Sequence, residues 1–325
     1  MSAIRVFTGL GAPHIMMVRG HDQSMELWIP ITIVAAFCQN LRSALQKHLK
    51  GKLSTGGATY VRFFYAWPFA VVYIWGLNTF AGMPYPEIQG RFILYCIAGG
   101  ASQIIFTALL VWLFSFRNFA VGTTFSKTET VQVALLAFIL LGDTLSLGAI
   151  LAIVVSVIGV MAMSVAQTNI TFRTLLSGLT EKSTLIGLAS GLFLGASVVF
   201  FRGASLELNY DGFIMPAAFT LAVAVVIQTL IMGVYLVWRE PGQMTACIKN
   251  WKWASAVGVA GVLGSIAWFS AFTLENAALV RAVGQIELVF TFIASVVFFR
   301  ETSTRLEIVG ILLVCLGIIL ILFLR

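Results

Sequence analysis

Two carboxylates stand out because each lies deep inside an apolar stretch of the chain. Glu129 is ten residues into the stretch 119–141, and Glu287 is ten residues into the stretch 277–299. At about 1.5 Å of rise per helical residue, each would sit about 15 Å deep, near the middle of a bilayer. A carboxylate at that depth can take up and release a proton and so couple or gate transport, because loss of solvation favours its protonated form. Alternatively, it holds an internal hydrogen-bond network and never titrates.

Other polar side chains share these stretches and could contact a substrate. Arg281 and Gln285 recur one helical turn apart, and Lys127 aligns with Gln285 when the two stretches are superposed. We expect six side chains to bind substrate: Gln39, Asn40, Lys127, Gln132, Arg281 and Gln285. For Gln132, which follows Thr124 and Thr128 at a spacing of four, hydrogen bonding between helices is an equal alternative.

Cations outnumber acids inside the apolar stretches. Arg42, Arg62 and Arg202 lie close enough to the ends of their stretches to reach the membrane surface with their long side chains, whereas Lys127 is too deep to do so easily. These four cations and Arg281 make five, against the two acids Glu129 and Glu287. This excess indicates an anionic or carboxylate-bearing substrate.

The composition of the chain indicates the environment that surrounds these residues. The chain of 325 residues is 59% hydrophobic and only 10% charged, with a mean hydropathy of +0.97. A soluble domain is about 45–50% apolar and about 25% charged. The apolar runs are continuous and do not alternate, which favours helices over a β-barrel. We therefore predict an all-α, multi-pass membrane protein in contact with the lipid bilayer.

The apolar runs predict about ten transmembrane helices. They fall at roughly 26–46, 57–79, 91–114, 119–141, 146–166, 184–206, 214–237, 252–274, 277–299 and 305–324. The longest polar connection, 167–183, separates two sets of five.

The two sets repeat one another at a shift of 158 residues. The aligned pairs include Asn118 with Asn276, Glu129 with Glu287, Asp143 with Glu301, and Gly159 with Gly317, and a shift of 160 aligns Arg42 with Arg202. Because five is odd, the second set must enter the membrane from the opposite side, which gives an inverted repeat. The predicted organisation is an N-terminal tail (1–25), a first five-helix repeat (26–166), a linker (167–183) and a second five-helix repeat (184–325).

Charge predicts an orientation for this bundle. The loops after the first, third, fifth, seventh and ninth helices hold eleven Lys and Arg residues against four on the other side. The positive-inside rule then puts both termini outside. The net charge of +7 is explained by membrane orientation, so nucleic acid is not an expected partner.

The sequence offers little for an enzyme or a metal site. The four cysteines are far apart, without a CxxC motif, and Ser, His and Asp do not converge on a nucleophile pattern. We expect no cofactor and no metal. A membrane enzyme acting on a lipid-linked substrate stays as the alternative function, and a structural or regulatory membrane partner as a third. The oligomeric state has no signature in the sequence.

The chain resembles the EamA domain of the drug/metabolite transporter superfamily. The resemblance rests on Gln285-Ile-Glu-Leu-Val-Phe-Thr-Phe, on Phe299-Arg-Glu-Thr-Ser-Thr-Arg-Leu, and on Gly310 and Gly317, with a second copy around Glu129, Gly142-Asp-Thr-Leu and Gly159. It covers 26–324. It implies a ten-helix inverted-repeat transporter of an inner or plasma membrane, often an exporter of amino acids or other metabolites, and it implies cytosolic termini, against the charge count.

The sequence therefore predicts a secondary transporter that exports a small metabolite, such as an amino acid or another carboxylate. It would work by alternating access in the cell (inner) membrane, with proton coupling or gating assigned to Glu129 and Glu287.

Overall fold

The computed structural model describes residues 13–49, 52–113, 116, 119–168, 180–293, 296 and 303–324. These residues form helices and connections and contain no strand, which confirms the all-α prediction. Most of the expected linker, 169–179, lies outside the described residues, as does the start of the N-terminal tail, 1–12.

Seven described segments are long and apolar enough to cross a bilayer. They are Phe92–Leu110, Val121–Leu141, Leu147–Ala166, Lys182–Glu207, Ile214–Arg239, Trp251–Leu274 and Arg305–Leu324. Each coincides with an expected span. The other three expected spans, at 26–46, 57–79 and 277–299, lie in helical segments but stay predictions as membrane crossings.

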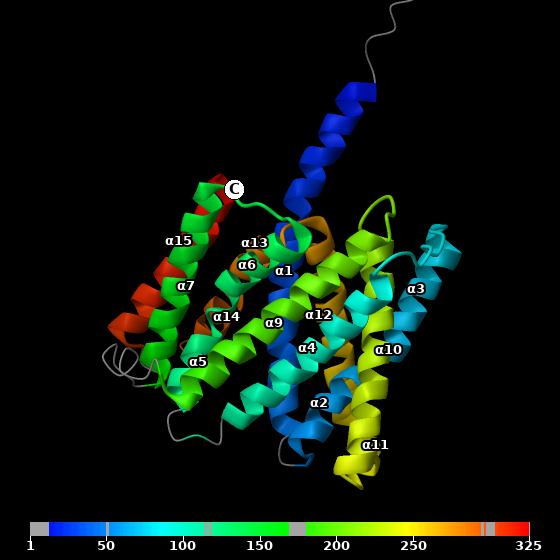
Figure 1. The fold of residues 1–325 in the computed structure, drawn as a ribbon, viewed down its shortest axis with the longest axis vertical. Coiled ribbons are helices and arrows are strands. Elements are labelled where there is room, and N and C mark those ends of the chain that lie inside the picture. Colours follow the sequence, from blue (N-terminus) through cyan, green and yellow to red (C-terminus); the bar gives the residue numbers. More distant parts are fainter. Residues whose placement is uncertain are drawn as a thin grey trace, which may run out of the picture.

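The described part of the first half of the bundle contains seven helices. They are α1 (Pro13–Leu49), α2 (Thr55–Phe64), α3 (Trp67–Ala81), α4 (Phe92–Leu113), α5 (Phe119–Ser126), α6 (Glu129–Leu141) and α7 (Leu147–Thr168). The start of α1 projects beyond the bundle (Figure 1), so this helix begins well before the expected span at 26–46.

The second half of the bundle also contains seven described helices. They are α9 (Lys182–Glu207), α10 (Ile214–Arg239), α11 (Gln243–Lys249), α12 (Trp251–Leu274), α13 (Ala277–Gly284), α14 (Ile286–Ile293) and α15 (Arg305–Leu324).

Three of the expected spans each contain an interruption between two shorter helices. Between α2 and α3 the cause is Pro68, which has no N–H to donate and whose ring clashes with the carbonyl of the preceding turn. The other two interruptions, between α5 and α6 and between α13 and α14, are closed by tight i→i−3 hydrogen bonds at Lys127, Thr128 and Gln285. They occur at positions that align at the shift of 158 residues, and Glu129 and Glu287 each lie in the first turn of the helix that follows.

The principal helix pairs cross between the halves. Helix α1 packs along α12, α4 along α9, and α7 along α15. In Figure 1, α4 and α9 run side by side through the middle of the bundle, and α7 and α15 form one flank. Close approach depends on small residues: a Cβ added to Gly187 of α9 would collide with the backbone of Gly122 in α5. Small residues at such crossings let membrane helices approach closely.

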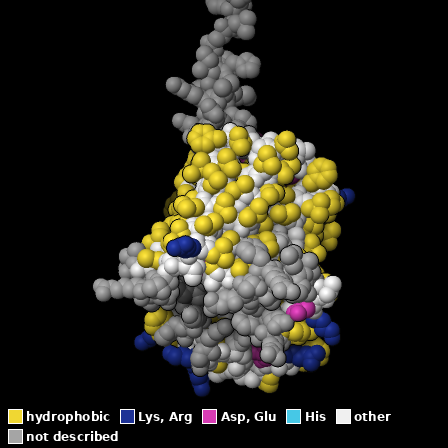
Figure 2. Space-filling view, turned by 90° about the vertical axis from the view of Figure 1, so that its left-hand side faces the viewer, with side chains coloured by type: hydrophobic (Ala, Val, Ile, Leu, Met, Phe, Trp, Pro, Cys, Tyr) yellow, Lys and Arg dark blue, Asp and Glu magenta, His cyan; other side chains and the backbone are white. Residues whose placement is uncertain are grey.

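The outer surface suits a lipid environment. Figure 2 shows hydrophobic side chains spread over most of one flank, with Lys and Arg gathered at the end away from the start of α1. Large apolar side chains are freely exposed there and elsewhere, among them Phe80, Trp238 and Phe323 at 77–81%. Such a surface would be unfavourable in water and favourable in hydrocarbon.

Candidate functional site

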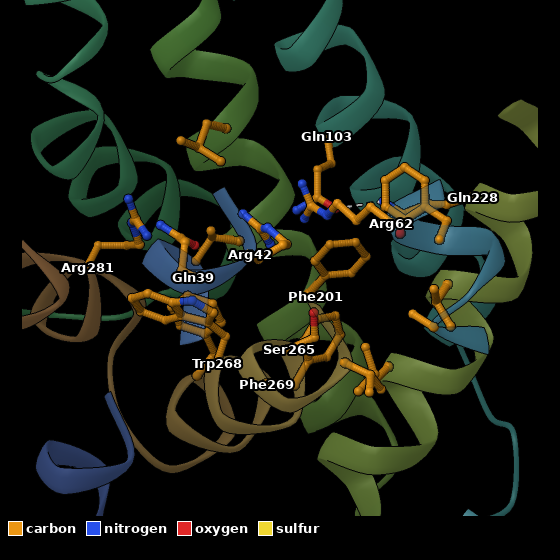
Figure 3. A pocket seen from close by; sticks show the side chains of 18 residues that line it. Gln39, Arg42, Arg62, Gln103, Phe201, Gln228, Ser265, Trp268, Phe269 and Arg281 are labelled. Carbon is orange, nitrogen blue, oxygen red and sulfur yellow. Dashed lines mark hydrogen bonds between the residues drawn. The ribbon is translucent and has the colours of Figure 1, made fainter. Parts of the chain in front are cut away.

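A cavity lies at the centre of the bundle and takes its walls from both halves. Its volume is about 70 Å³, space for about five water molecules or one small organic acid. Helices α1, α2 and α4 of the first half and α9, α10, α12 and α13 of the second contribute side chains. The polar ones are Gln39, Arg42, Arg62, Gln103, Gln228, Ser265 and Arg281, and Trp268, Phe201 and Phe269 lead the apolar ones (Figure 3).

Two arginines face each other in this cavity. Arg42 of α1 and Arg62 of α2 extend toward one another (Figure 3). Among the described residues neither forms an ion pair, and Nε of Arg42 is buried without a hydrogen-bond partner. The guanidinium of Arg62 lies 5.1 Å from the centroid of the Phe63 ring. Two like charges held together without an ion-pair partner among the described residues favour the binding of an anion.

Neutral polar groups occupy the rest of the polar wall. Gln228 of α10 donates from Nε2 to Oε1 of Gln103 in α4 across 2.8 Å, and Ser265 lies on α12. Trp268 is 7% exposed, and its Nε1 has no hydrogen-bond partner among the described residues. Its indole N–H is therefore a donor left for a ligand, since a buried donor is costly when it is unsatisfied.

The third arginine of the cavity is paired. Arg281 of α13 forms an ion pair with Glu129 at the start of α6, and both side chains are buried. The guanidinium also lies 5.1 Å from the centroid of the Trp268 ring. The pair joins the second half to the first, and it fixes one wall of the cavity.

Glu287 is bound differently. Gln39 of α1 donates to its carboxylate, and Nδ2 of Asn40 donates to its backbone oxygen across 2.9 Å. Arg42 and Arg281 are close enough to interact with Glu287 electrostatically, although neither forms an ion pair with it. Glu287 is only partly buried, and it stands directly behind Gln39, which lines the cavity.

The structure brings some of the expected substrate-binding residues to the cavity and leaves others outside it. Gln39 and Arg281 line it, and Asn40 supports Glu287 behind it. Gln285 instead donates to Oγ1 of Thr130 across 3.3 Å, and Lys127 does not line the cavity.

Gln132 also points away from the cavity. It donates to Oγ1 of Thr128 across 3.2 Å, and its Oε1 faces Gly191 of α9. Thr124 shares a hydrogen bond of 2.7 Å with Ser164 of α7. These contacts favour the alternative in which this polar line joins helices.

Arg202 holds one end of the cavity together. Its Nε lies 3.0 Å from Oδ2 of Asp143, in the connection between α6 and α7. Its Nη1 donates to the carbonyl oxygens of Phe272 and Glu275 at the end of α12. We call this group the Arg202 clamp. The connection from α6 to α7 lies at the end of the bundle from which α1 projects, and α11 lies at the other end (Figure 1).

Sequence reasoning missed the centre of the site. It treated Arg42, Arg62 and Arg202 as reaching the membrane surface, which is wrong for all three, because two line the cavity and the third is bound in the clamp. It did not select Gln103, Gln228 or Trp268. Gln103 and Gln228 could have been selected from the sequence, because both lie inside apolar runs. Among the described residues no group of His, Cys, Asp and Glu could hold a metal ion.

The chain is similar to a known family in sequence and to solved structures in fold. Residues 182–323 match the sequence model of the EamA-like transporter family. No curated protein sequence matches the chain. Among 28 matching chains of solved structures, one titled "Crystal structure of protein" superposes with a TM-score of 0.68 at 12% identity, covering 92% of this chain and 99% of that chain. At that identity the likeness shows the fold alone.

Proposed function

We propose, from the match of residues 182–323 to the EamA-like transporter family, that the chain carries a membrane transporter domain of the drug/metabolite superfamily and that the protein is a secondary transporter. It exports a small carboxylate-bearing metabolite across the cell (inner) membrane by alternating access. The substrate occupies the central cavity. Arg42 and Arg62 bind its carboxylate, with Gln39 and Arg281 beside them.

The proposal includes a ten-helix inverted repeat, in which the first half is a second EamA-like unit. Two features support it. The pairing of α1 with α12 and of α4 with α9 exchanges the first and third helices of the two halves, as an axis in the membrane plane would require. The interruptions before Glu129 and Glu287 occur at the same place in each unit. Interrupted helices near the midplane are typical of transporter binding sites.

The observation that carries the proposal is that Arg42 and Arg62 face each other and form no ion pair among the described residues. A charged side chain within a membrane is costly and is normally paired or turned to a water-filled path. Neither Arg42 nor Arg62 forms an ion pair among the described residues, and both line the central cavity. A bound carboxylate would supply the missing charge.

The two glutamates take different parts in this mechanism. Glu129, buried and paired with Arg281, holds the halves in register and gates the movement between them. Glu287, held by amides, is the group that responds to protons, because a neutral amide accepts either protonation state of its partner. Its charge lies next to the substrate site, so a proton on Glu287 and an anion in the cavity favour one another.

The Arg202 clamp gives the cycle a closed end. It joins the first half, through Asp143, to α9 and α12 of the second. Under the orientation that the basic loops favour, this closed end is the outer one. When the anion crosses without a proton on Glu287, an interior-negative membrane drives it outward by about 2.3 kcal/mol per charge for each 100 mV, and this direction is export.

Efflux from proteoliposomes tests this function. Vesicles are loaded with a mixed panel of metabolites, and the lost species are identified by mass spectrometry with and without a pH gradient. We expect selective loss of carboxylates in wild type, and loss of that activity in Arg62→Gln. The matched control, Arg239→Gln, removes an exposed arginine at the end of α10 that contacts Trp238 and lies outside the cavity. Equal efflux from wild type and empty vesicles contradicts transport.

A further inference from the structure

The chemistry of the cavity wall narrows the substrate class. Resting on the transport function proposed above, we propose that the ligand of this cavity is a net anion with a planar apolar body and without an ammonium group, and that zwitterionic amino acids are rejected. Three features of the wall carry this inference: the kind of charge it presents, the unsatisfied donors, and the aromatic face.

Among the described residues, the cavity wall presents cations but no carboxylate. Its seven polar side chains are three arginines, three glutamines and one serine. Glu129 is engaged by Arg281, and the carboxylate of Glu287 is turned to the amide of Gln39, so neither acid lines the cavity. An amino acid would bring its ammonium group within reach of Arg42 and Arg62 without a carboxylate to meet it. That placement is repulsive and leaves a charge unpaired in a poorly solvated site.

The unsatisfied polar atoms around the cavity are mainly donors. Nε of Arg42 and Nε1 of Trp268 are buried without partners among the described residues. A carboxylate or sulfonate has acceptors only and satisfies donors of this kind. The acceptor Oε1 of Gln103 already receives the hydrogen bond from Gln228. The wall is therefore complementary to an acceptor-only head group.

Beside this polar wall lies an aromatic one. The rings of Phe201 and Phe269 stand 4.9 Å apart at 36°, and Trp268 stacks with Phe272 at 5.4 Å and 17°. Figure 3 shows Phe201, Phe269 and Trp268 grouped on one side of the two arginines. Val198, Leu221 and Val225 add further apolar surface to the cavity. A planar apolar body gains from burial against such a surface, and aromatic contact adds to that gain.

Four ligands separate the contributions of charge and body. They are 3-phenylpropionate, phenylalanine, phenethylamine and acetate, which present the same ring as an anion, a zwitterion and a cation, and then the anionic head alone. Binding is measured by isothermal titration calorimetry on the full chain in nanodiscs, because weak acids and amines leak through vesicles. We expect 3-phenylpropionate to bind at least about ten-fold more tightly than each of the others.

Variants link the binding to the cavity. Arg62→Gln should weaken 3-phenylpropionate at least about ten-fold, while Arg239→Gln leaves it unchanged. If Arg62→Gln does not fold, Arg62→Lys keeps the charge and the ranking of the four ligands in wild type still decides. If phenylalanine binds as tightly as 3-phenylpropionate, the proposal that the site rejects an ammonium group is wrong. If acetate binds as tightly, the proposal that the site selects an apolar body is wrong. Binding of none of the four overturns the inference, whereas the metabolite efflux assay decides transport separately.

Discussion

Equivalent positions of the two halves are bonded in opposite ways. Glu129 and Glu287 align at a shift of 158 residues, yet the first is buried in an ion pair with Arg281 and the second is held by the amides of Gln39 and Asn40. Arg202 and Arg42 align at a shift of 160, yet Arg202 is bound to Asp143 and to two carbonyl oxygens, whereas Arg42 lines the cavity without an ion pair among the described residues.

The contrast separates residues that fasten the halves from residues that remain available to a ligand. Each aligned pair contributes one fastened and one available side chain. The available ones, Arg42 and Glu287, interact electrostatically and lie at or behind the cavity wall. An inverted repeat that alternates between two states must be asymmetric in either state, because one end is closed while the other is open. The unequal bonding of equivalent residues is the asymmetry that such a cycle needs.

The largest expected effect comes from breaking the fastened glutamate. Glu129→Gln leaves the buried guanidinium of Arg281 without its counterion, which should cost about 3–5 kcal/mol of stability. Glu287→Gln should cost less than about 1 kcal/mol, because the new amide can still bond with Gln39. Thermal unfolding of both variants in detergent, followed by size-exclusion fluorescence, measures the difference.

A double variant controls for damage unrelated to charge. Glu129→Gln with Arg281→Gln removes both charges together and should recover most of the lost stability, because the cost lies in the unpaired ion. Equal destabilisation by the Glu129 and Glu287 variants would remove the distinction between a fastened and an available glutamate.

A smaller effect is expected at the Arg202 clamp. Asp143→Asn removes the charge that holds Arg202 and should favour opening of that end by about 1.5–3 kcal/mol. The readout is labelling of a Ser265→Cys reporter in the cavity by an impermeant maleimide, in a background without the four native cysteines. We expect labelling to rise about ten-fold or more.

The control for the clamp is a carboxylate at the other end of the bundle. Glu240 follows α10 and accepts a hydrogen bond from Ser54 before α2. Glu240→Gln should leave the labelling of the Ser265→Cys reporter from the clamp end unchanged. A rise as large as that of Asp143→Asn would show that loss of any buried carboxylate loosens the bundle, and the clamp would lose its specific part.

These variants also mark what the sequence could and could not predict. Apolar length and the absence of alternation were enough for helical class and for seven spans, because both follow from the solvent. The repeat drew attention to Glu129 and Glu287, because aligned charges are visible without coordinates. Their different partners were not predictable, since Arg281 lies 152 residues from Glu129 and Gln39 lies 248 residues from Glu287.

The arginines also show a limit of prediction from sequence. Depth along a span says how near Arg42 and Arg62 are to an end, but not which way the helix turns them. Their placement in the cavity depends on how α1 packs along α12 and how α2 meets α12 and α10. Lys127 and Gln132 were selected on depth and spacing alone, and packing turned Gln132 toward α9.

The smallest expected effect concerns the available glutamate, and it decides between the two functions open to a midplane carboxylate. The charged groups around Glu287 are Arg42 of α1 and Arg281 of α13, and Gln39 and Asn40 are neutral. Removal of the negative charge of Glu287 would favour an anion in the neighbouring cavity. Glu287→Gln should therefore bind 2-phenylethanesulfonate, whose own charge is constant, up to about ten-fold more tightly than wild type.

The amide of the variant resembles the protonated acid, so the comparison shows what a proton on Glu287 would do to anion binding. Calorimetric titrations of both proteins measure it, with Glu240→Gln as the control that keeps the affinity of wild type. Equal affinities of wild type and Glu287→Gln would mean that the charge of Glu287 does not act on the anion site. Its bonds to α1 would then serve only to hold α14 in place, and both glutamates would be fastened after all.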